Sequence, residues 1–391
     1  MPRASFVYAH AAAPEWQDAV ADCVGQLQTR MTAQPGEPGR FTLGWCYLSD
    51  YFAPAAEAIL ESLQQELPGV AWVGTAGYGV LASGVEYIDE PALVLMVAPL
   101  PQESFRLFSG RQPLATASAD FVAHTSLVHG EGSTPDVQDL LHELSERTTT
   151  GYLFGGLSSA RNRTLHIADG VFTGGLSGVL FGPDVHLISR VTQGCQPIGP
   201  LRAVTQSEDN FVIALDGRPA LDCVMQDLGI DGELPADELS DALSATLVGM
   251  SCGNEDLPHN PGKFGPDILV RHLVGVDLQN RVLAIADQVE ADTQLAFCKR
   301  HPEAARRDLL RIATEIRAEL EAGTSGALAG ALYVSCSGRG GPHFGARHAE
   351  LKIVRDVLGD VPLVGFFAGG EIARDHLYGY TGVLTVFTTG A

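Results

Sequence analysis

One structural unit recurs along the chain and restricts what it can fold into. Near the C-terminus the unit consists of a β-rich run at 331–335, a helix at 349–358, a second β-rich run at 361–365 and a closing strand at 382–387. The helix carries its apolar residues on one face, and Gly359 suits the position after its last turn. Because an amphipathic helix must cover a sheet, repeats of this unit predict helices layered on sheets.

Two earlier segments show the same order. The middle copy has a strand at 125–128, a helix whose cap and first turn are Thr134-Pro135-Asp136, a glycine-containing run at 151–156 and a closing strand within 171–181. The first copy has a strand at 41–48, a helix opened by Pro54 and stopped by Pro68-Gly69, and strands at 70–74 and 92–97. A fourth copy is suggested because 247–255 matches 363–371 at a leucine, a valine, two glycines and a glutamate. Chance agreement in a glycine-rich chain is the alternative.

The predicted fold class is therefore α/β of the α+β type. Repeated strand-helix-hairpin units form layered helices over mixed, largely antiparallel sheets, in two related halves. Glycine and short polar turns separate the last two strands of each unit, so we expect those two to pair antiparallel. A doubly wound parallel sheet is less favoured, because helices do not follow every strand.

Composition and charge exclude several classes of protein. Charged residues make up 18% and hydrophobic residues 45%, which predicts a folded chain with a sizeable core. A net charge of −22 opposes binding to nucleic acid or to anionic membranes. The seven cysteines are widely spaced without a CxxC pair, the N-terminus lacks a signal-peptide core, and no apolar run is long enough to span a bilayer. We therefore expect a cytoplasmic protein without membrane insertion.

Five segments, in order, carry a resemblance to a known family. They are 192–199 (TQGCQPIG), 210–220 (NFVIALDGRPA), 268–277 (ILVRHLVGVD), 294–300 (QLAFCKR) followed by Ala304-Ala305 and Asp308-Leu309, and 365–372 (GFFAGGEI) with 378–384. Together they make the chain from about Phe41 to Phe387 resemble FIST proteins, the F-box and intracellular signal transduction group. The segment after Glu371 is shorter than the family pattern, and Arg300-His301 stands where an Arg-Asp pair is usual.

The resemblance implies a domain division and a function. It predicts an N-terminal lead-in (1–40), a FIST N-terminal domain (41–204) and a FIST C-terminal domain (205–391). It further implies a stand-alone, non-enzymatic sensory module of signal transduction that binds a small ligand, with amino acids as the suggested class. No output segment is recognised in these residues, so we expect any signalling partner to be a separate protein.

The glycines of the repeated unit offer a place for such a ligand. In each copy an apolar strand is expected to stop at glycine, at Gly74, Gly155, Gly249 or Gly365. Glycine there would expose backbone N–H groups. An amino acid would place its carboxylate on these groups and its ammonium on an acid. The predicted ligand-binding residues are Cys336, Ser337, Arg339, Gly370, Glu371 and Tyr380. The alternative is that the glycines only permit tight turns and close packing.

Catalytic and metal motifs are weaker. Cys336 precedes a helix and has His343 and His348 nearby, so a cysteine hydrolase or transferase is the alternative function. The competing interpretation is a small thiol at the end of a strand. The runs at 77–82 and 156–160 imitate a dinucleotide loop and a nucleophile elbow, but neither is followed by a predicted helix, so both are expected to be turns. No metal site or cofactor is expected, and an acidic protein-interaction scaffold is the third hypothesis.

Overall fold

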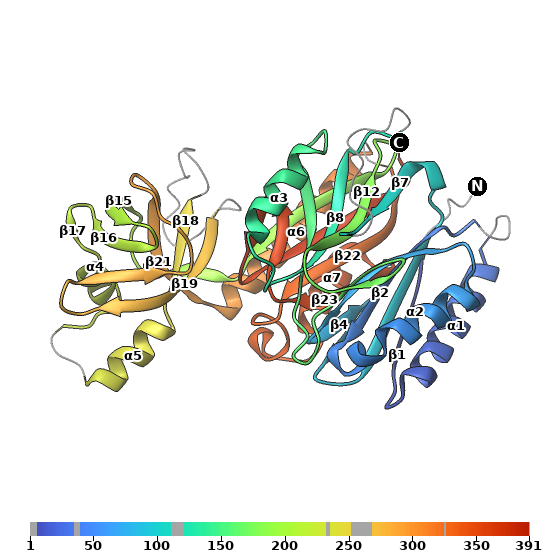
Figure 1. Ribbon diagram of the computed structural model, residues 1–391, viewed down its shortest axis with the longest axis horizontal. Coiled ribbons are helices and arrows are strands. Elements are labelled where there is room, and N and C mark those ends of the chain that lie inside the picture. The colour runs from blue at the N-terminus through green and yellow to red at the C-terminus, as the bar shows by residue number, and fades with distance from the viewer. Residues whose placement is uncertain are drawn as a thin grey trace. The chain divides into compact units, whose positions relative to one another are not determined.

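The protein is described by a computed structural model, which covers residues 6–34, 40–110, 121–231, 235–251, 268–323 and 326–390 (Figure 1). The chain divides into two compact units. Unit 1 comprises residues 1–192 and 306–391, and unit 2 comprises residues 193–305. Unit 1 is thus built from two separate stretches of sequence, with unit 2 inserted between them.

Unit 1 contains three sheets of six strands among its described residues. In spatial order the first is β1 (Val7–Ala12), β6 (Ala92–Ala98), β2 (Leu43–Ser49), β3 (Ala71–Gly77), β10 (His166–Ala168) and β11 (Val171–Phe172). The second is β7 (Phe105–Phe108), β12 (Leu176–Phe181), β8 (Thr125–Glu131), β9 (Tyr152–Ser158), β24 (Glu371–Arg374) and β25 (His376–Tyr378). The third is β13 (His186–Gln193), β26 (Thr381–Thr388), β22 (Leu328–Cys336), β23 (Leu363–Ala368), β4 (Gly79–Ala82) and β5 (Val85–Ile88).

The helices of unit 1 flank these sheets. They are α1 (Trp16–Thr32), α2 (Ala56–Glu66), α3 (Val137–Glu146), α6 (Pro302–Glu321, which begins in unit 2) and α7 (Ala349–Leu358), with 3-10 turns at Asp50–Ala55, Gln102–Ser104 and Gly341–Phe344. Helices α1 and α2 lie next to each other and share a buried core with strands of the first sheet (Figure 1). No helix of the described ranges has the length and apolar character needed to cross a membrane.

Two predicted helix starts need correction, while a third helix is confirmed. The last helix runs over 349–358 as expected, and Gly359 follows it with φ of 80°. By contrast, α3 begins at Val137, and the hydroxyl of Thr134 accepts a hydrogen bond from the Gly175 N–H instead of capping the helix. Pro54 lies in the 3-10 turn before α2, because its fixed φ also suits that tighter geometry.

Each copy of the repeated unit pairs its strands by the same rule, which differs from the predicted one. The strands before and after the helix are parallel neighbours: β2 with β3, β8 with β9, and β22 with β23. The closing strands β6, β12 and β26 are antiparallel to the first strand of their copy, so the expected pairing with the second strand is wrong. A helix allows this crossover to a parallel partner, which the local pattern of turns does not reveal.

Between the second and closing strands each copy forms a short hairpin that joins the sheet of another copy. The β4–β5 hairpin of the first copy pairs through β4 with β23 of the third. The β10–β11 hairpin of the second pairs with β3 of the first, and the β24–β25 hairpin of the third pairs with β9 of the second. This cyclic exchange gives unit 1 a threefold repeat in connectivity and ties the C-terminal segment into the N-terminal sheets.

Unit 2 interrupts the third copy at one defined place. In the first copy β1 leads directly to α1, whereas in the third the corresponding step from β13 to α6 contains residues 194–301. The elements of unit 2 are β14 (Cys195–Pro197), β15 (Arg202–Glu208), β16 (Phe211–Leu215), β17 (Arg218–Pro219), α4 (Ala220–Asp227), α5 (Ala236–Ser244), β18 (Leu247–Ser251), β19 (Ile268–Asp277), β20 (Val282–Ile285) and β21 (Gln294–Arg300). Its sheet closes on itself, because β21 pairs with both β15 and β18.

The suggested fourth copy does not share the pairing of the other three. Strand β18 has antiparallel neighbours on both sides, β19 and β21, where β3, β9 and β23 each have a parallel one. Residues 252–255 of that match lie outside the described residues. The fold class itself is confirmed, because helices flank mixed sheets whose pairings are mostly antiparallel.

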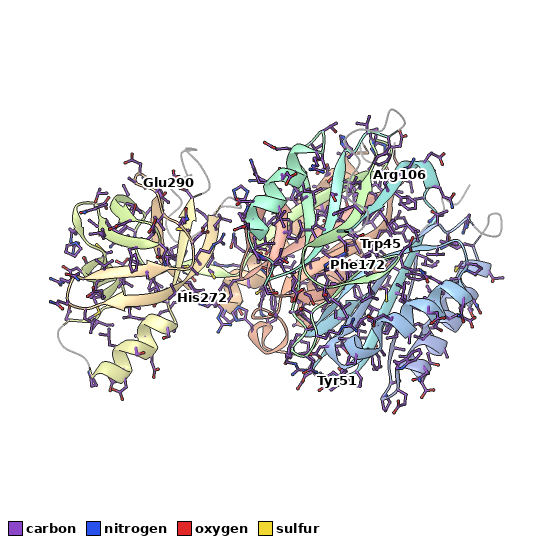
Figure 2. The ribbon with its side chains drawn as sticks, viewed as in Figure 1. Trp45, Tyr51, Arg106, Phe172, His272 and Glu290 are labelled. Atoms are coloured by element: carbon purple, nitrogen blue, oxygen red, sulfur yellow. The ribbon has the colours of Figure 1, made fainter. Side chains whose placement is uncertain are left out.

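An aromatic cluster fills the middle of unit 1, where side chains from all three sheets meet. The ring of Trp45, labelled in Figure 2, stacks on Phe6 and lies 5.5 Å from the ring of Phe387. Tyr47 of the first sheet donates to or accepts from His129 of the second across 3.1 Å. Burial lowers the pKa of His129 to about 3, so this imidazole stays neutral and serves packing.

Candidate functional site

The six predicted ligand-binding residues lie together at the carboxyl ends of β22 and β23. Cys336 is the last residue of β22, and its carbonyl accepts the Arg339 N–H at 2.9 Å. The Ser337 N–H donates to Ala368, the last residue of β23, at 2.8 Å. Gly370 and Glu371 follow that strand, and Tyr380 precedes β26. The structure therefore brings these residues together.

Arg339, however, is committed to the protein interior. Its side chain is 1% exposed, and its Nε donates to Glu350 at 3.1 Å. Nη1 donates to the Thr192 carbonyl at 3.0 Å and Nη2 to the Thr192 hydroxyl at 3.2 Å. Thr192 is the last residue of unit 1 before the chain enters unit 2. Arg339 thus holds the end of β13 in place, a structural role that would compete with binding a ligand carboxylate.

Glu350, on α7, is the centre of this buried network. One carboxylate oxygen, Oε1, accepts from the Tyr333 hydroxyl at 2.5 Å and the Ser335 hydroxyl at 2.9 Å, in addition to Arg339. Glu86, from the β4–β5 hairpin, accepts the N–H groups of Glu350 and Leu351 at the start of α7. Burial, then the neighbouring Glu350, raises the pKa of Glu86 to about 7. A carboxyl that is partly protonated near neutrality can share this interior with Glu350.

Glu371 and Cys336 are also buried side chains of this cluster. Glu371 is fully buried, and its Oε2 accepts the N–H and hydroxyl of Thr381 at 3.1 Å and 2.8 Å. Burial raises the pKa of Glu371 to about 8, so it is mostly neutral at pH 7 and offers no full charge to an ammonium ion. Burial, reinforced by Glu371, also raises the pKa of the Cys336 thiol far above its usual range.

The threefold repeat shows what Cys336 does. Cys336, Ser49 and Glu131 end the first strand of their copies, each opposite the last residue of the parallel partner. Ser49 accepts the N–H of Ala92 at 2.9 Å, where the closing strand begins. Glu131 accepts a hydrogen bond from the N–H of Gly174, just before the closing strand β12. Cys336 accepts one from the N–H of Tyr380, just before the closing strand β26. In all three copies this side chain fastens the start of the closing strand.

The geometry disfavours the cysteine-enzyme alternative. A nucleophilic thiolate needs a lowered pKa, and burial acts on Cys336 in the opposite direction. His348, one of the two candidate bases, uses its Nδ1 to accept the N–H of Glu86 at 2.9 Å. Neither imitation motif is followed by a helix, as expected, but the prediction that both are turns is wrong: residues 79–82 form β4, and residues 156–158 end β9. No group of three or more potential metal ligands gathers among the described residues.

Three of the four repeated glycines, Gly74, Gly155 and Gly365, serve sheet packing. Strands β3, β9, β18 and β23 continue beyond Gly74, Gly155, Gly249 and Gly365, so the prediction that they stop there is wrong. A Cβ at Gly365 would lie 1.7 Å from the Tyr333 carbonyl oxygen of the parallel partner strand. A Cβ added at Gly74 or Gly155 would lie 1.8 or 2.0 Å from the equivalent carbonyl oxygen, that of Cys46 or Val128. Glycine is needed there because the neighbouring backbone approaches too closely for any side chain.

A groove elsewhere in unit 1 is the better candidate for a ligand site. It has a volume of about 630 Å³ and lies at the amino ends of β8 and β9, whose first residues Thr125 and Tyr152 line it. The other lining residues are His124, Thr150, Pro183, Val185, His186, Leu187, Ile188, Ser189, Arg190, Glu319 and Thr388. None of the six predicted residues belongs to this lining. The volume lies in the usual range for small-molecule sites.

Polar groups converge on this groove beside an apolar wall. Burial raises the pKa of Tyr152, opposed by hydrogen bonding to Ser189 and by the charges of Arg374 and Arg190. The hydroxyl of Thr388 is buried and has no hydrogen-bond partner within the described part of the chain. Pro183, Val185, Leu187 and Ile188 supply the apolar side. Such a mixture can orient a small amphipathic molecule.

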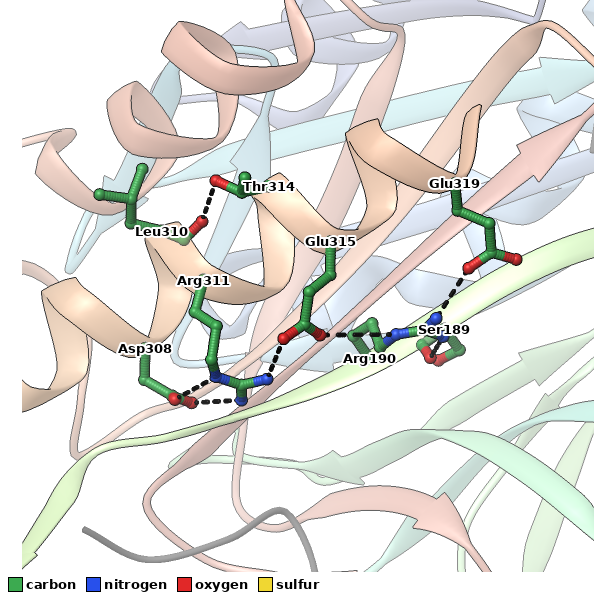
Figure 3. A network of polar contacts seen from close by, with 8 residues as sticks. All are labelled: Ser189, Arg190, Asp308, Leu310, Arg311, Thr314, Glu315 and Glu319. Carbon is green, nitrogen blue, oxygen red and sulfur yellow. Dashed lines mark hydrogen bonds and ion pairs between the residues drawn. The ribbon is translucent and has the colours of Figure 1, made fainter. Parts of the chain in front are cut away.

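The charged side of the groove belongs to an ion-pair network on α6 (Figure 3). Arg190 of β13 donates through Nη2 to Glu319 at 2.7 Å, and its Nε lies 3.8 Å from Glu315. Arg311 donates through Nη1 to Glu315 and through Nε to Asp308, each at 2.8 Å. Arg190 is 38% exposed and Glu319 37%, in contrast to the buried Arg339.

Sequence reasoning missed this groove. Its lining comes from β8, β9, β13, β26 and α6, which are spread from residue 124 to residue 388. Its polar residues form no motif of fixed spacing. Strand β13 has exposed or half-buried side chains at His186, Leu187, Ser189 and Arg190, but they do not alternate along the strand and give no clear signal.

Comparison with known proteins assigns the chain to a family. The FIST N domain model matches residues 42–218, and the FIST C domain model matches residues 220–374. The chain belongs to the FIST family. FIST domains are sensory modules of signal transduction.

Similar proteins occur in mycobacteria. An uncharacterized protein of Mycobacterium tuberculosis is 30% identical over 343 residues, covering 84% of this chain and 86% of that protein. An uncharacterized protein of Mycobacterium bovis is 28% identical over 388 residues, covering 96% of both chains.

The family models divide the FIST chain differently from its compact units. The change from N to C model, after residue 218, falls within strand β17 of unit 2. The predicted boundary at 204/205 falls within β15 of the same unit and stays a prediction. The predicted lead-in contains β1, which pairs with β6, and α1.

Proposed function

We propose that this FIST protein is a cytoplasmic, non-enzymatic sensory module that binds a small ligand in the groove of unit 1. The observation that carries the proposal is the groove itself, about 630 Å³ with polar groups from several elements beside an apolar wall. Family membership supports the sensory role, and the six described cysteines, all buried and free, suit a reducing compartment.

The position of the groove in the chain suits signal output. Arg190 lies on β13, which leads the chain into unit 2, and Glu319 lies on α6, which brings it back. A ligand in the groove would therefore contact both the strand that leads to unit 2 and the helix that returns from it. We expect the output to pass to a separate signalling protein.

A groove-filling variant tests the proposal. Saturation-transfer NMR would screen mixtures of amino acids, simple carboxylates, amines and sugars. We expect at least one of these classes to bind the wild-type protein, and Ser189→Trp to abolish that binding by placing an indole in the groove. Ser207→Trp, at a half-buried serine of unit 2, is the matched control and should retain it.

Two results would overturn the proposed groove. One is that no class binds the wild-type protein, which would favour the acidic scaffold instead. The other is that binding persists in a folded Ser189→Trp variant, as judged by an unchanged melting temperature. In that case the six residues around Cys336 and Glu371, which stay a predicted ligand site, become the next target.

A further inference from the structure

Arg190 and Glu319 form the one part of the described groove in which opposite charges already face each other. Nη2 of Arg190 donates to Glu319 at 2.7 Å, Nη1 donates to the carbonyl of the neighbouring Ser189 at 2.9 Å, and Nε lies 3.8 Å from Glu315. Both partners are more than a third exposed, so the pair contributes little to stability and is easily exchanged. Arg339, with three bonded nitrogens in the interior, has no such freedom.

The surroundings of Arg190 specify what could replace Glu319. The imidazoles of His124 and His186 also line the groove, and neither would repel a ligand carboxylate. A bidentate carboxylate is the preferred partner of a guanidinium. The apolar wall formed by Pro183, Val185, Leu187 and Ile188 suits a short hydrocarbon part of the same molecule.

Removing Arg190 from Glu319 has a consequence for α6. Glu319 and Glu321 lie in the last turn of this helix, and no basic residue of the helix lies in that turn. Acidic side chains at a helix C-terminus oppose the helix dipole, and a nearby cation relieves this. Arg317, one residue before that turn, pairs with Glu321 at 2.7 Å, and Arg190 supplies the cation for Glu319 from β13. Loss of Arg190 therefore leaves Glu319 uncompensated and weakens the last turn.

We infer that the groove binds a carboxylate-bearing small molecule with an apolar part, whose carboxylate takes Arg190 from Glu319 and thereby loosens the C-terminal turn of α6. The inference rests on the proposed function and adds the ligand class and the response. It links ligand binding to the helix that returns the chain from unit 2.

Three acid–amide pairs test the ligand class: hexanoate with hexanamide, L-leucine with L-leucinamide, and phenylacetate with phenylacetamide. We expect at least one acid to bind, and its amide to bind roughly tenfold more weakly or worse, because a hydrogen-bonded charge is lost. Arg190→Gln should weaken binding of that acid by a similar factor. Glu319→Gln should tighten it, because the competing carboxylate is removed.

Hydrogen exchange tests the response in the same protein. The acid should speed exchange of the amides at 318–323 and leave those of α7 unchanged. Arg190→Gln should show the faster exchange without ligand, and Glu319→Gln should show no change when the acid is added. This pattern separates release of Arg190 from general loosening.

The possible failures are distinguishable. If none of the six probes binds and the wider screen is also empty, the groove function fails and the inference with it. If molecules bind but amides bind as tightly as acids, or if Glu319→Gln weakens binding of the acid, the inference is wrong while the groove function stands. Binding of an acid with unchanged exchange at 318–323 would overturn the response.

Discussion

Two regions of unit 1 contain the same kinds of side chain and use them differently. The cluster at the carboxyl ends of β22 and β23 joins Arg339 to Glu350 in the interior, where both are at most 1% exposed. The groove at the amino ends of β8 and β9 joins Arg190 to Glu319, both more than a third exposed. An arginine–glutamate pair is therefore no sign of a ligand site by itself; its burial and the number of its bonds decide.

The difference follows from what each arginine holds. Arg339 donates to Glu350 and to both oxygen atoms of Thr192, so losing it removes the cation beside Glu350 and these donors to buried Thr192. Arg190 faces a hollow where water or a ligand can replace Glu319. Four tests separate a structural cluster from a binding groove.

The largest expected effect is on stability at the two arginines. Arg339→Met leaves buried Glu350 without its cationic partner in the network, although the hydroxyls of Tyr333 and Ser335 still donate to it, and should lower the free energy of unfolding by about 3–5 kcal/mol. Arg190→Met removes an exposed pair and should cost no more than about 1 kcal/mol. Urea unfolding followed by circular dichroism measures both. Equal costs would contradict the comparison.

A glycine beside the cluster gives the next largest effect. Gly365→Ala places a Cβ against the Tyr333 carbonyl and should destabilise unit 1 by about 3 kcal/mol or more. Gly25→Ala, on α1 with open space around it, should be neutral or stabilising by up to about 1 kcal/mol. Melting temperatures of the two variants provide the measurement. A tolerated Gly365→Ala would reopen a ligand role for this glycine.

The buried acids predict a dependence on pH. The pKa of Glu86 rises from 4.5 to about 7, and that of Glu371 from 4.5 to about 8. The folded state therefore binds more protons than the unfolded state between pH 4.5 and 8, and this contribution to stability falls as pH rises through that window. The loss is on the order of a few kcal/mol.

Glutamine variants isolate this contribution. Glu86→Gln and Glu371→Gln should each gain stability relative to the wild-type protein as pH rises from 4.5 to 8. Glu57→Gln is the opposite control: hydrogen bonding to Arg163 lowers the pKa of Glu57, so its contribution is lost only as pH falls below about 4.5. Denaturant unfolding across this range measures the differences. Parallel profiles for all variants would refute the assignment.

The smallest effect concerns Cys336. Its buried thiol, with a raised pKa, should react with iodoacetamide at pH 7 only after unfolding. Cys336→Ser, which copies Ser49 of the first repeat, should retain the fold. Peptide mass spectrometry in buffer and in urea follows the labelling. Rapid alkylation of the native protein would restore the cysteine-enzyme hypothesis.

The sequence predicts elements whose signal is local. The helix at 349–358 is recognised because its apolar residues and Gly359 lie within a few turns. Helix α1 also carries a local signal, because its buried residues have helical spacing, although the predicted elements do not include it; these residues are Ala19, Val20, Cys23, Val24 and Leu27. The hairpin exchange could not be predicted, because partners such as β4 and β23 are far apart in sequence and carry no local mark of each other.

For the site, the sequence predicts proximity but not exposure. The ends of β22 and β23 meet because parallel strands bring their carboxyl ends together, so Cys336, Arg339 and Glu371 converge as expected. Their burial depends on elements that come from elsewhere in the chain, including the β4–β5 hairpin with Glu86 and Thr192 at the end of β13.

The most direct test measures binding in two variants side by side. One variant carries Ser189→Trp and the other Glu371→Gln. Titration calorimetry measures how each binds whichever of hexanoate, L-leucine and phenylacetate has the highest affinity for the wild-type protein. If the groove is the ligand site, Ser189→Trp abolishes binding and Glu371→Gln leaves the affinity unchanged. Loss of binding in Glu371→Gln with normal binding in Ser189→Trp would contradict the account and place the ligand at the buried cluster.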